Sequence, residues 1–197
     1  MAEEESPVSV LDLSPKKQLA FALLVFERML PRMVAFCKDT GVDYSCCSQA
    51  SDVAWCDIEA GGRYRTLYRS LNRACLNNAP DTEDFTHEMT SDSLNAFLTM
   101  SEIMAFMLDG SSDHIEYIST LATDSVDLYV AHLEPALITT KERDDWIASH
   151  PLMQQEFQRE KEDIKFLAAL PDHFDSETIA ALKARSSSQP PILPLTR

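Results

Sequence analysis

The sequence predicts an all-α fold in a single domain, and three features of its 197 residues support this prediction. Glycine occurs only four times, which helices tolerate better than sheets with their tight turns. Apolar residues make up 45% of the chain, a normal share for a protein with its own core. They recur every three or four positions in successive segments, which is the spacing of amphipathic helices. We therefore expect an irregular antiparallel bundle of about seven helices.

The helical domain is expected to cover residues 13–185. Residues 1–12 are predicted to form a flexible acidic lead-in, and residues 186–197, rich in Ser and Pro, a disordered tail. The chain opens with Met-Ala-Glu-Glu-Glu, which is unlike a secretory signal. Its longest apolar run, residues 19–26, is far shorter than the roughly 20 residues that span a bilayer. These features predict a cytoplasmic protein that does not bind membranes.

The first predicted helix begins at Ser14-Pro15, where serine can act as the cap and proline fits the first turn. Apolar residues between positions 19 and 37 lie on nearly all sides of this helix, so its first half should be buried. Pro31 should kink or split the helix, because it lacks a backbone N–H. Gly41 is a suitable terminator.

Glu27 and Arg28 lie just before this proline, among strongly apolar positions. Charged side chains are seldom buried unless they are paired. A structural ion pair is therefore the favoured interpretation of these two residues. A role in a binding site is the alternative.

Two further helices are predicted over residues 45–58 and 63–77, with Gly61-Gly62 between them. The second helix carries an apolar stripe that consists of Tyr64, Leu67, Tyr68, Leu71, Ala74 and Cys75. Arg65, Arg69 and Arg73 follow at four-residue steps along one edge of this stripe. We expect these arginines to contact carboxylates of residues 81–134. An acidic partner subunit and an anionic ligand are the alternatives.

The second half of the chain continues the helical pattern. Helices are predicted over residues 91–108, 112–132, 139–149, 150–170 and 175–185. The first two are joined by a short connection and should be antiparallel neighbours. The methionines of the first are expected to be adaptable core residues rather than a partner-binding surface. Thr139 and Glu142 have the spacing of a capping box.

The charge of the chain is concentrated in its middle. Residues 74–140 contain twelve acidic residues and no Lys or Arg, so they supply −12 of the net charge of −15. Nucleic acids and anionic membranes require clustered cations, so neither is the expected partner. The acidic middle instead suggests a surface for a cationic protein partner. A homodimer is also possible.

The motifs of several enzyme classes are absent from the sequence. It contains no glycine-rich phosphate loop and no Gly-x-Ser-x-Gly turn. His114 and His132 lie on one predicted helix, about 27 Å apart by the helical rise, so they cannot share a metal ion. Asp124 and Asp127 lie one turn apart and would need a histidine or another ligand from a second helix. We predict no catalytic residue, no metal site and no cofactor.

The five cysteines show no Cys-x-x-Cys spacing, which fits reduced thiols better than disulfides. Cys46 and Cys47 lie near a predicted helix start, where the pKa of a thiol can be lowered. They are the best candidates for reactive cysteines. The favoured interpretation is that they are inert, small hydrophobic residues.

Several runs of the sequence resemble a family of bacterial proteins. Phe26-Glu27-Arg28-Met29-Leu30-Pro31, followed by Phe36-Cys37 and Thr40-Gly41, resembles the opening signature of the YjaG-like family. Ala79-Pro80, Asp84-Phe85 and the run His150-Pro151-Leu152-Met153-Gln154-Gln155-Glu156 follow in the family's order. The family is helical and of unknown function, so the resemblance implies a cytoplasmic helical domain and no activity. The chain departs from the family pattern at residues 86–93 and 187–192.

Two classes of function follow from these observations. The favoured one is a non-enzymatic interaction or regulatory module that presents an acidic surface to a cationic partner. The alternative is a metal- or carboxylate-dependent enzyme that uses the acidic residues of 81–134. Convergence of Asp124 and Asp127 with a histidine in a pocket would favour the enzyme.

Overall fold

The computed structural model describes residues 9–62, 64–133 and 140–195, and every regular element within these ranges is helical. A short 3-10 helix, η1 (Val10–Asp12), precedes eight α-helices. These are α1 (Pro15–Thr40), α2 (Ser45–Ala60), α3 (Arg65–Asn78), α4 (Thr90–Asp109), α5 (Asp113–Leu133), α6 (Thr140–Ser149), α7 (Pro151–Ala169) and α8 (Ser176–Ser188). The predicted all-α fold of about seven helices is confirmed.

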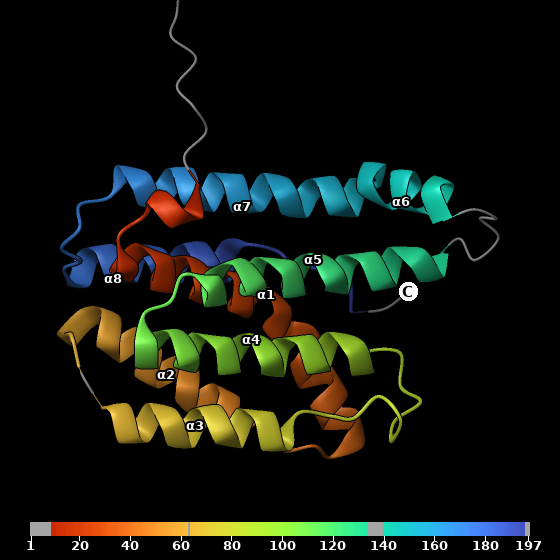
Figure 1. Cartoon of the computed structure of the whole chain (residues 1–197), viewed down its shortest axis with the longest axis horizontal. Helices are drawn as coiled ribbons and strands as arrows, with labels where there is room; N and C mark the ends of the chain where they lie inside the picture. Colours follow the sequence, from red (N-terminus) through yellow and green to blue (C-terminus); the bar gives the residue numbers. More distant parts are fainter. Residues whose placement is uncertain (1–8, 63, 134–139, 196–197) are drawn as a thin grey trace, which may run out of the picture.

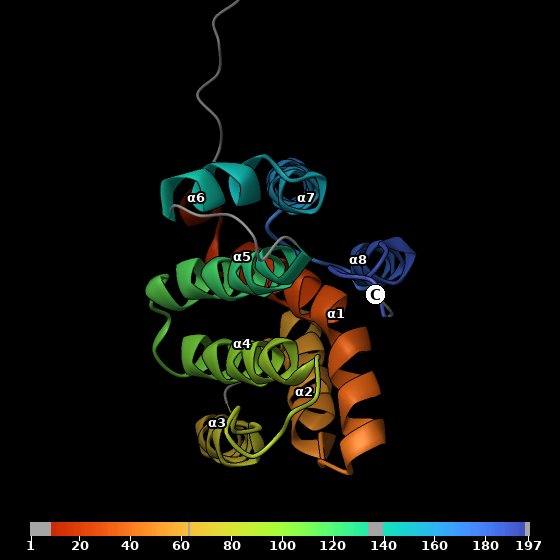
Figure 2. The same ribbon diagram turned by 90° about the vertical axis from the view of Figure 1, so that its right-hand side faces the viewer.

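Helix α1 forms the centre of the fold and packs against α2, α4, α5, α7 and α8. The side chains from Leu19 to Phe26 are at most 5% exposed, as expected for a helix surrounded by others. Pro31 lies inside α1 without ending it. Figures 1 and 2 show that the helix bends partway along its length. Gly41 ends α1 in the left-handed conformation, with a φ of 80°.

Helices α3, α4, α5 and α7 are stacked side by side, and α1, α2 and α8 lie to one side of this stack (Figure 2). Helix α4 lies between α3 and α5 in the stack and also packs against α1. Met100 and Met104 are therefore completely buried, which confirms that the methionines of α4 pack in the core. Helices α4 and α5 are antiparallel neighbours, as predicted (Figure 1).

The prediction of a disordered tail was wrong for residues 186–195, because this segment packs against α1. The Ile192 N–H donates a hydrogen bond of 2.9 Å to the carbonyl oxygen of Arg28. Ile192 and Leu193 are 3% and 1% exposed. The Ser- and Pro-rich composition concealed these two apolar side chains, whose burial contributes free energy that keeps the segment ordered.

The beginning of the chain is partly described. Residues 1–8 of the expected lead-in lie outside the described residues, as does Thr139 of the predicted capping box. Ser9 caps η1, and Val10 packs in the core. Among the helices of the described ranges, none combines the length and the apolar character that crossing a membrane requires.

Candidate functional site

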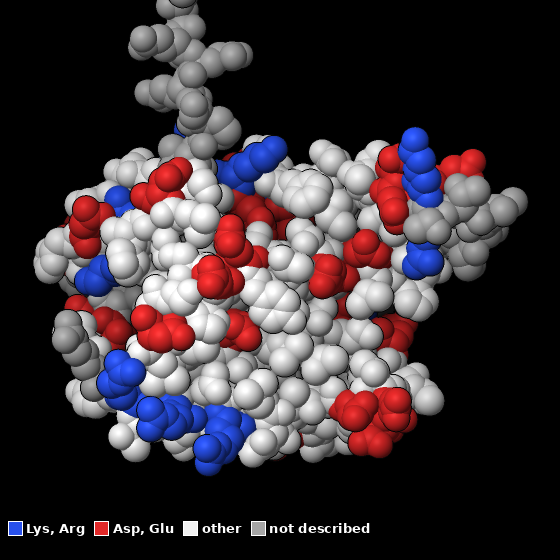
Figure 3. Space-filling model, in the orientation of Figure 1, with Lys and Arg blue, Asp and Glu red and all other residues white. Residues whose placement is uncertain are grey.

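Arg65, Arg69 and Arg73 lie along one edge of α3, and all three are exposed. Figure 3 shows the basic side chains in a row over this helix. None of the three forms an ion pair with another described residue. The backbone of Ser111 is the main group that lowers the pKa of Asp109, and Arg65 adds only a weak effect. The predicted direct contacts with the acidic segment are therefore not formed by its described carboxylates.

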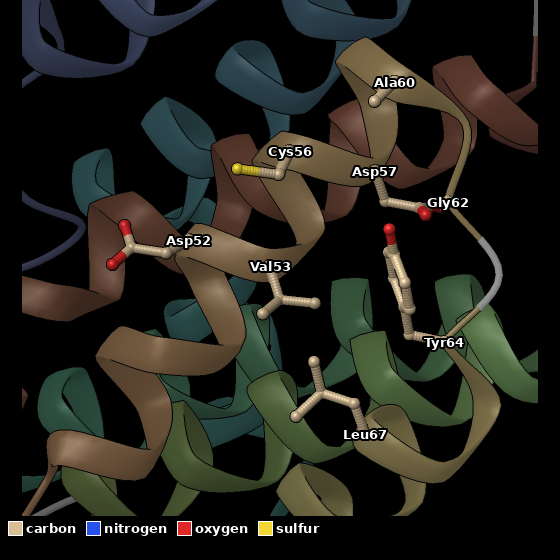
Figure 4. A pocket seen from close by; sticks show the side chains of 8 residues that line it. All are labelled: Asp52, Val53, Cys56, Asp57, Ala60, Gly62, Tyr64 and Leu67. Atoms are coloured by element: carbon tan, nitrogen blue, oxygen red, sulfur yellow. The ribbon is translucent and has the colours of Figure 1, made fainter.

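A pocket of about 260 Å³ opens between α2 and α3 beside the arginine row (Figure 4). Its walls are formed by Asp52, Val53, Cys56, Asp57, Ala60, Gly62, Tyr64 and Leu67. Tyr64 and Leu67 are 66% and 42% exposed, and Figure 4 shows both side chains pointing toward α2. Within the predicted apolar stripe, Tyr68, Leu71 and Cys75 reach the core instead. Large apolar side chains that stay exposed beside a hollow are typical of a binding surface.

The wall of this pocket is held by polar contacts. The Tyr68 hydroxyl donates a hydrogen bond of 2.7 Å to Asp57 Oδ1. Burial, together with this hydrogen bond, raises the pKa of Tyr68. A Cβ atom at Gly62 would lie 2.7 Å from both Asp57 Oδ1 and the Tyr64 ring. Glycine at this position therefore lets the two side chains approach.

The arginines and the exposed apolar residues share one surface. A shallow hollow next to the pocket is lined by Tyr64, Arg65 and Leu67, together with Thr66 and Ser70. A second hollow, lined by Thr66, Ser70, Arg69 and Arg73, continues along the helix. We refer to Tyr64, Arg65, Leu67, Arg69 and Arg73 as the α3 face. It combines forked hydrogen-bond donors with apolar area.

Glu27 and Arg28, the other two candidate residues, point to different neighbours. Trp55 Nε1 donates a hydrogen bond of 3.3 Å to Glu27 Oε1, and Ser51 Oγ donates one of 3.4 Å. Lys183 Nζ of α8 lies 5.6 Å from the centre of a Trp55 ring. A hollow of about 260 Å³ is lined by Glu27, Trp55 and Lys183, among others. Glu27 thus joins α1 to α2.

Arg28 is buried with two carboxylates of α7. Its Nη2 lies 2.7 Å from Glu156 Oε1, and its Nη1 lies 2.6 Å from Asp163 Oδ2. Arg185 of α8 donates a hydrogen bond of 2.8 Å to the other oxygen of Asp163. Arg28 is 2% exposed, so these contacts connect α1, α7 and α8 in the interior. Its partners come from α7 and not from the neighbouring Glu27.

Glu160 extends this buried group and was not singled out from the sequence. Ser119 Oγ of α5 donates a hydrogen bond of 2.5 Å to Glu160 Oε2, whereas Glu160 Oε1 has no partner among the described residues. Burial raises the pKa of Glu160 to about 7. The hydrogen bond from Ser119 opposes this shift, and the negative charge of Glu156 adds to it. No sequence pattern predicts the burial of the Glu160 carboxyl group, since this burial depends on how α5 and α7 pack.

The acidic segment contributes mainly exposed side chains. Eight of its described acids are exposed, namely Asp81, Glu83, Asp84, Glu88, Asp109, Asp113, Glu116 and Asp124. Figure 3 shows many acidic side chains on the same side of the molecule as the basic row. Asp92 is buried and pairs with Arg32 of α1, whose Nε lies 2.7 Å from Asp92 Oδ2. Arg32 also donates through Nη1 to the carbonyl oxygen of Pro194.

The histidines do not gather with the paired aspartates. His114 Nδ1 lies 2.5 Å from Glu102 Oε2, and its Nε2 lies 3.2 Å from Asp109 Oδ2. Burial opposes the charged form of this ring, but the two carboxylates outweigh it and raise the pKa of His114. Within the described ranges, Asp124 and Asp127 form no cluster with metal-ligand spacing.

Three cysteines form the one cluster of described residues that has the spacing of a metal site. Cys46 and Cys47 lie in the first turn of α2, and Cys75 lies in the last turn of α3. All three are buried, and their sulfur atoms lie within 4.8 Å of one another. Hydrogen bonds from Cys47 and Cys75 lower the pKa of Cys46. Their contacts with Cys46 raise the pKa values of Cys47 and Cys75.

Comparisons with known proteins identify a family and a fold. A structure of a DUF416 family protein from Shewanella baltica OS155 matches with a TM-score of 0.81 over 90% of this chain and 91% of that chain. The two sequences are 17% identical, so this likeness concerns the fold alone. No curated protein matches. The sequence pattern described as "Protein of unknown function (DUF416)" matches residues 8–190, and the chain therefore belongs to the DUF416 family.

Proposed function

We propose that this protein is a non-enzymatic interaction module and that the α3 face is its binding surface. The observation that carries the proposal is the combination of an apolar pocket with three exposed arginines that form no ion pair with a described residue. Tyrosine and arginine are enriched among the residues that dominate binding energy at protein interfaces. Tyr64 and Leu67 already expose apolar surface that a partner would cover.

The chemistry of this face selects an acidic partner. Arginine forms paired hydrogen bonds with carboxylates, and these are stronger than hydrogen bonds between neutral groups. Arg69 and Arg73 are one helical turn apart, as are Arg65 and Arg69, so a second helix with acids at the same interval matches the row. An apolar side chain of that partner would enter the pocket beside Leu67. The ligand class is thus an acidic, amphipathic protein segment.

A second candidate is a cationic partner on the acidic surface of residues 81–134. It is favoured by the eight exposed acids of this segment. Attraction between such a surface and a basic protein speeds association and weakens steeply with salt. Because both surfaces occur on one chain, a second copy of the protein is a further possible partner.

The subfamily of the chain, its bacterial source and its location in the cell are also proposals. We infer that it is a YjaG-like, cytoplasmic member of its family in bacteria. The run Phe26–Pro31 and the run His150–Glu156 support the first part. Five cysteines that all remain free thiols support the second. Fractionation of the source cells, followed by immunoblotting, tests the location.

The interaction module is tested by capturing partners from lysate with four versions of the protein: the wild type, an α3 variant, a matched control and an acidic-surface variant. The α3 variant combines Leu67→Ser, Arg69→Gln and Arg73→Gln, all at exposed positions where the fold should be insensitive. We expect a partner that binds the wild type and loses about tenfold or more in affinity for this variant, which corresponds to about 1.4 kcal/mol. The purified partner is then measured by titration calorimetry.

The matched control combines Leu128→Ser, Lys161→Gln and Lys165→Gln, which change one exposed leucine and two exposed bases elsewhere. It should bind as the wild type does. Equal binding by the α3 variant contradicts the assignment of the α3 face. If only Asp81→Asn, Glu83→Gln and Asp84→Asn together abolish binding, the acidic surface is the binding site. No specific capture by any version overturns the interaction module.

A further inference from the structure

The cysteine cluster brings together side chains from two helix ends that are distant in sequence. Cys46 and Cys47 begin α2, whereas Cys75 lies near the end of α3. Cys47 Sγ and Cys75 Sγ are 3.8 Å apart, and Cys46 Sγ lies within 4.8 Å of both. The three thiols are free, and none is part of a disulfide.

The separation of these sulfur atoms matches the geometry of thiolates around one metal ion. A zinc–sulfur bond is about 2.3 Å long, so two sulfurs at tetrahedral positions are about 3.8 Å apart. Cys47 and Cys75 already have this separation. Cys46 Sγ lies within 4.8 Å of both, which is close to the same separation. Three sulfur ligands select thiophilic ions such as Zn²⁺ and Cu⁺ over Mg²⁺ or Ca²⁺.

The surroundings of the cluster favour a negative charge on the sulfur atom of Cys46. Cys46 lies at the N-terminal end of α2, where the free N–H groups of the first turn stabilise negative charge. Cys47 Sγ donates a hydrogen bond of 3.8 Å to Cys75 Sγ, so these two thiols already face one another. A bound cation promotes ionisation of the cluster, because a coordinating thiol gives up its proton.

The cluster also has a route of entry. Cys46 is 8% exposed, whereas Cys47 and Cys75 have no exposed surface. Cys37, in the last turn of α1, is buried nearby, and its pKa is raised to about 11 mainly by burial. The charge of Asp43 adds to this shift. An ion would therefore enter past Cys46 and bind between α2 and α3.

We propose that Cys46, Cys47 and Cys75 bind one thiophilic metal ion, Zn²⁺ or Cu⁺, through their three sulfur atoms. Each coordinated thiol releases its proton to solvent, so binding weakens as the pH falls. The ion would tie the start of α2 to the end of α3. This inference is independent of the α3 face and of any protein partner.

The test is a metal titration of the reduced, full-length protein under anaerobic conditions. Co²⁺ serves as the spectroscopic probe, because its absorption bands report tetrahedral thiolate ligands. We expect one Co²⁺ per chain with these bands, displacement by Zn²⁺ or Cu⁺, and a higher melting temperature with the displacing ion. Proton release on binding is recorded in the same titration.

Variants separate this site from adventitious binding. Cys46→Ala changes the least buried of the three ligands and should abolish the thiolate bands while leaving the helical circular dichroism unchanged. Cys56→Ala, which changes an exposed cysteine on the same helix, should bind one ion as the wild type does. The proposal is overturned if neither Zn²⁺ nor Cu⁺ binds stoichiometrically. It is equally overturned if Cys46→Ala retains the thiolate bands.

Discussion

Glu160 is a carboxyl group whose ionisation is coupled to folding. It lies in the interior between α5 and α7, and one of its oxygens has no hydrogen-bond partner among the described residues. Removing a carboxylate from water disfavours its charged form, so the folded protein binds a proton more tightly than the unfolded chain. This single residue therefore links stability to pH.

The sign of this linkage follows from the two pKa values of Glu160. The pKa is about 4.3 in the unfolded chain and about 7 in the folded protein. Between these values the folded state holds a proton that the unfolded state has released, so stability falls as the pH rises. The full loss above the folded pKa is about 4 kcal/mol.

Glu160→Gln should remove this pH dependence, because glutamine stays neutral and its oxygen can accept the Ser119 hydrogen bond. The measurement is urea unfolding of both proteins at about pH 5 and about pH 8. The variant should be more stable than the wild type at the higher pH. Glu162→Gln, at an exposed position of α7, serves as the control. Identical pH profiles for Glu160→Gln and the wild type would refute the linkage.

At the scale of the elements, the segment that follows α8 acts as part of the core. Ile192 and Leu193 are buried, and the segment receives hydrogen bonds from arginines of two helices. Arg32 of α1 donates to the carbonyl of Pro194, and Arg159 of α7 donates to that of Pro191 over 3.2 Å. The segment fixes α1 and α7 although it is not itself helical.

Leu193→Ala should destabilise the protein by about 2–5 kcal/mol, because it leaves a cavity in the interior. Leu195→Ala provides a matched comparison, since Leu195 is 45% exposed and its truncation should change stability by less than about 0.5 kcal/mol. Chemical denaturation of the two variants distinguishes them. Equal, small effects would mean that the segment does not pack as described.

At the scale of the whole molecule, two distant parts of the sequence meet in the buried charge cluster. The run Phe26–Pro31 lies on α1, and the run His150–Glu156 covers the start of α7. Arg28 of the first run pairs with Glu156 of the second. These two sequence runs are thus in contact, and they hold together helices that are far apart in the sequence.

Arg28→Met should be among the most destabilising substitutions, because it removes the buried cation that pairs with both Glu156 and Asp163. Removal of one member of a buried ion pair costs about 3–5 kcal/mol. Lys161→Met, on an exposed position of α7, should cost less than about 0.5 kcal/mol. Thermal and urea unfolding measure both. A cost for Arg28→Met as small as that of Lys161→Met would show that the cluster is not stabilising.

Most of the fold was predictable from local patterns. Helix boundaries at Pro15, Gly41 and Gly110 follow from backbone chemistry that acts within a few residues. The buried segment at Ile192 was not predictable, because its order depends on side chains of α1 that are far away in sequence. The amino-acid composition of a segment does not show which other parts of the chain pack against it.

The candidate site was predictable only in part. The spacing of Arg65, Arg69 and Arg73 placed them in one row, but sequence could not show that they form no ion pair with a described carboxylate. Tyr64 and Leu67 followed the core periodicity, and only the packing of α2 shows that they stay exposed. The meeting of Cys75 with Cys46 has no sequence signal, since it depends on where two helix ends lie in space.

The hydrogen bonds of Arg32 have a consequence for biosynthesis. Arg32 is made early and donates to the carbonyl of Pro194, which the ribosome adds 162 positions later. Until that segment leaves the exit tunnel, the guanidinium of α1 lacks this acceptor, and the hydrophobic surface that Ile192 and Leu193 cover stays open. A nascent chain therefore cannot complete its core until this segment has emerged. Products of premature termination expose this surface and are natural targets for chaperones and proteases.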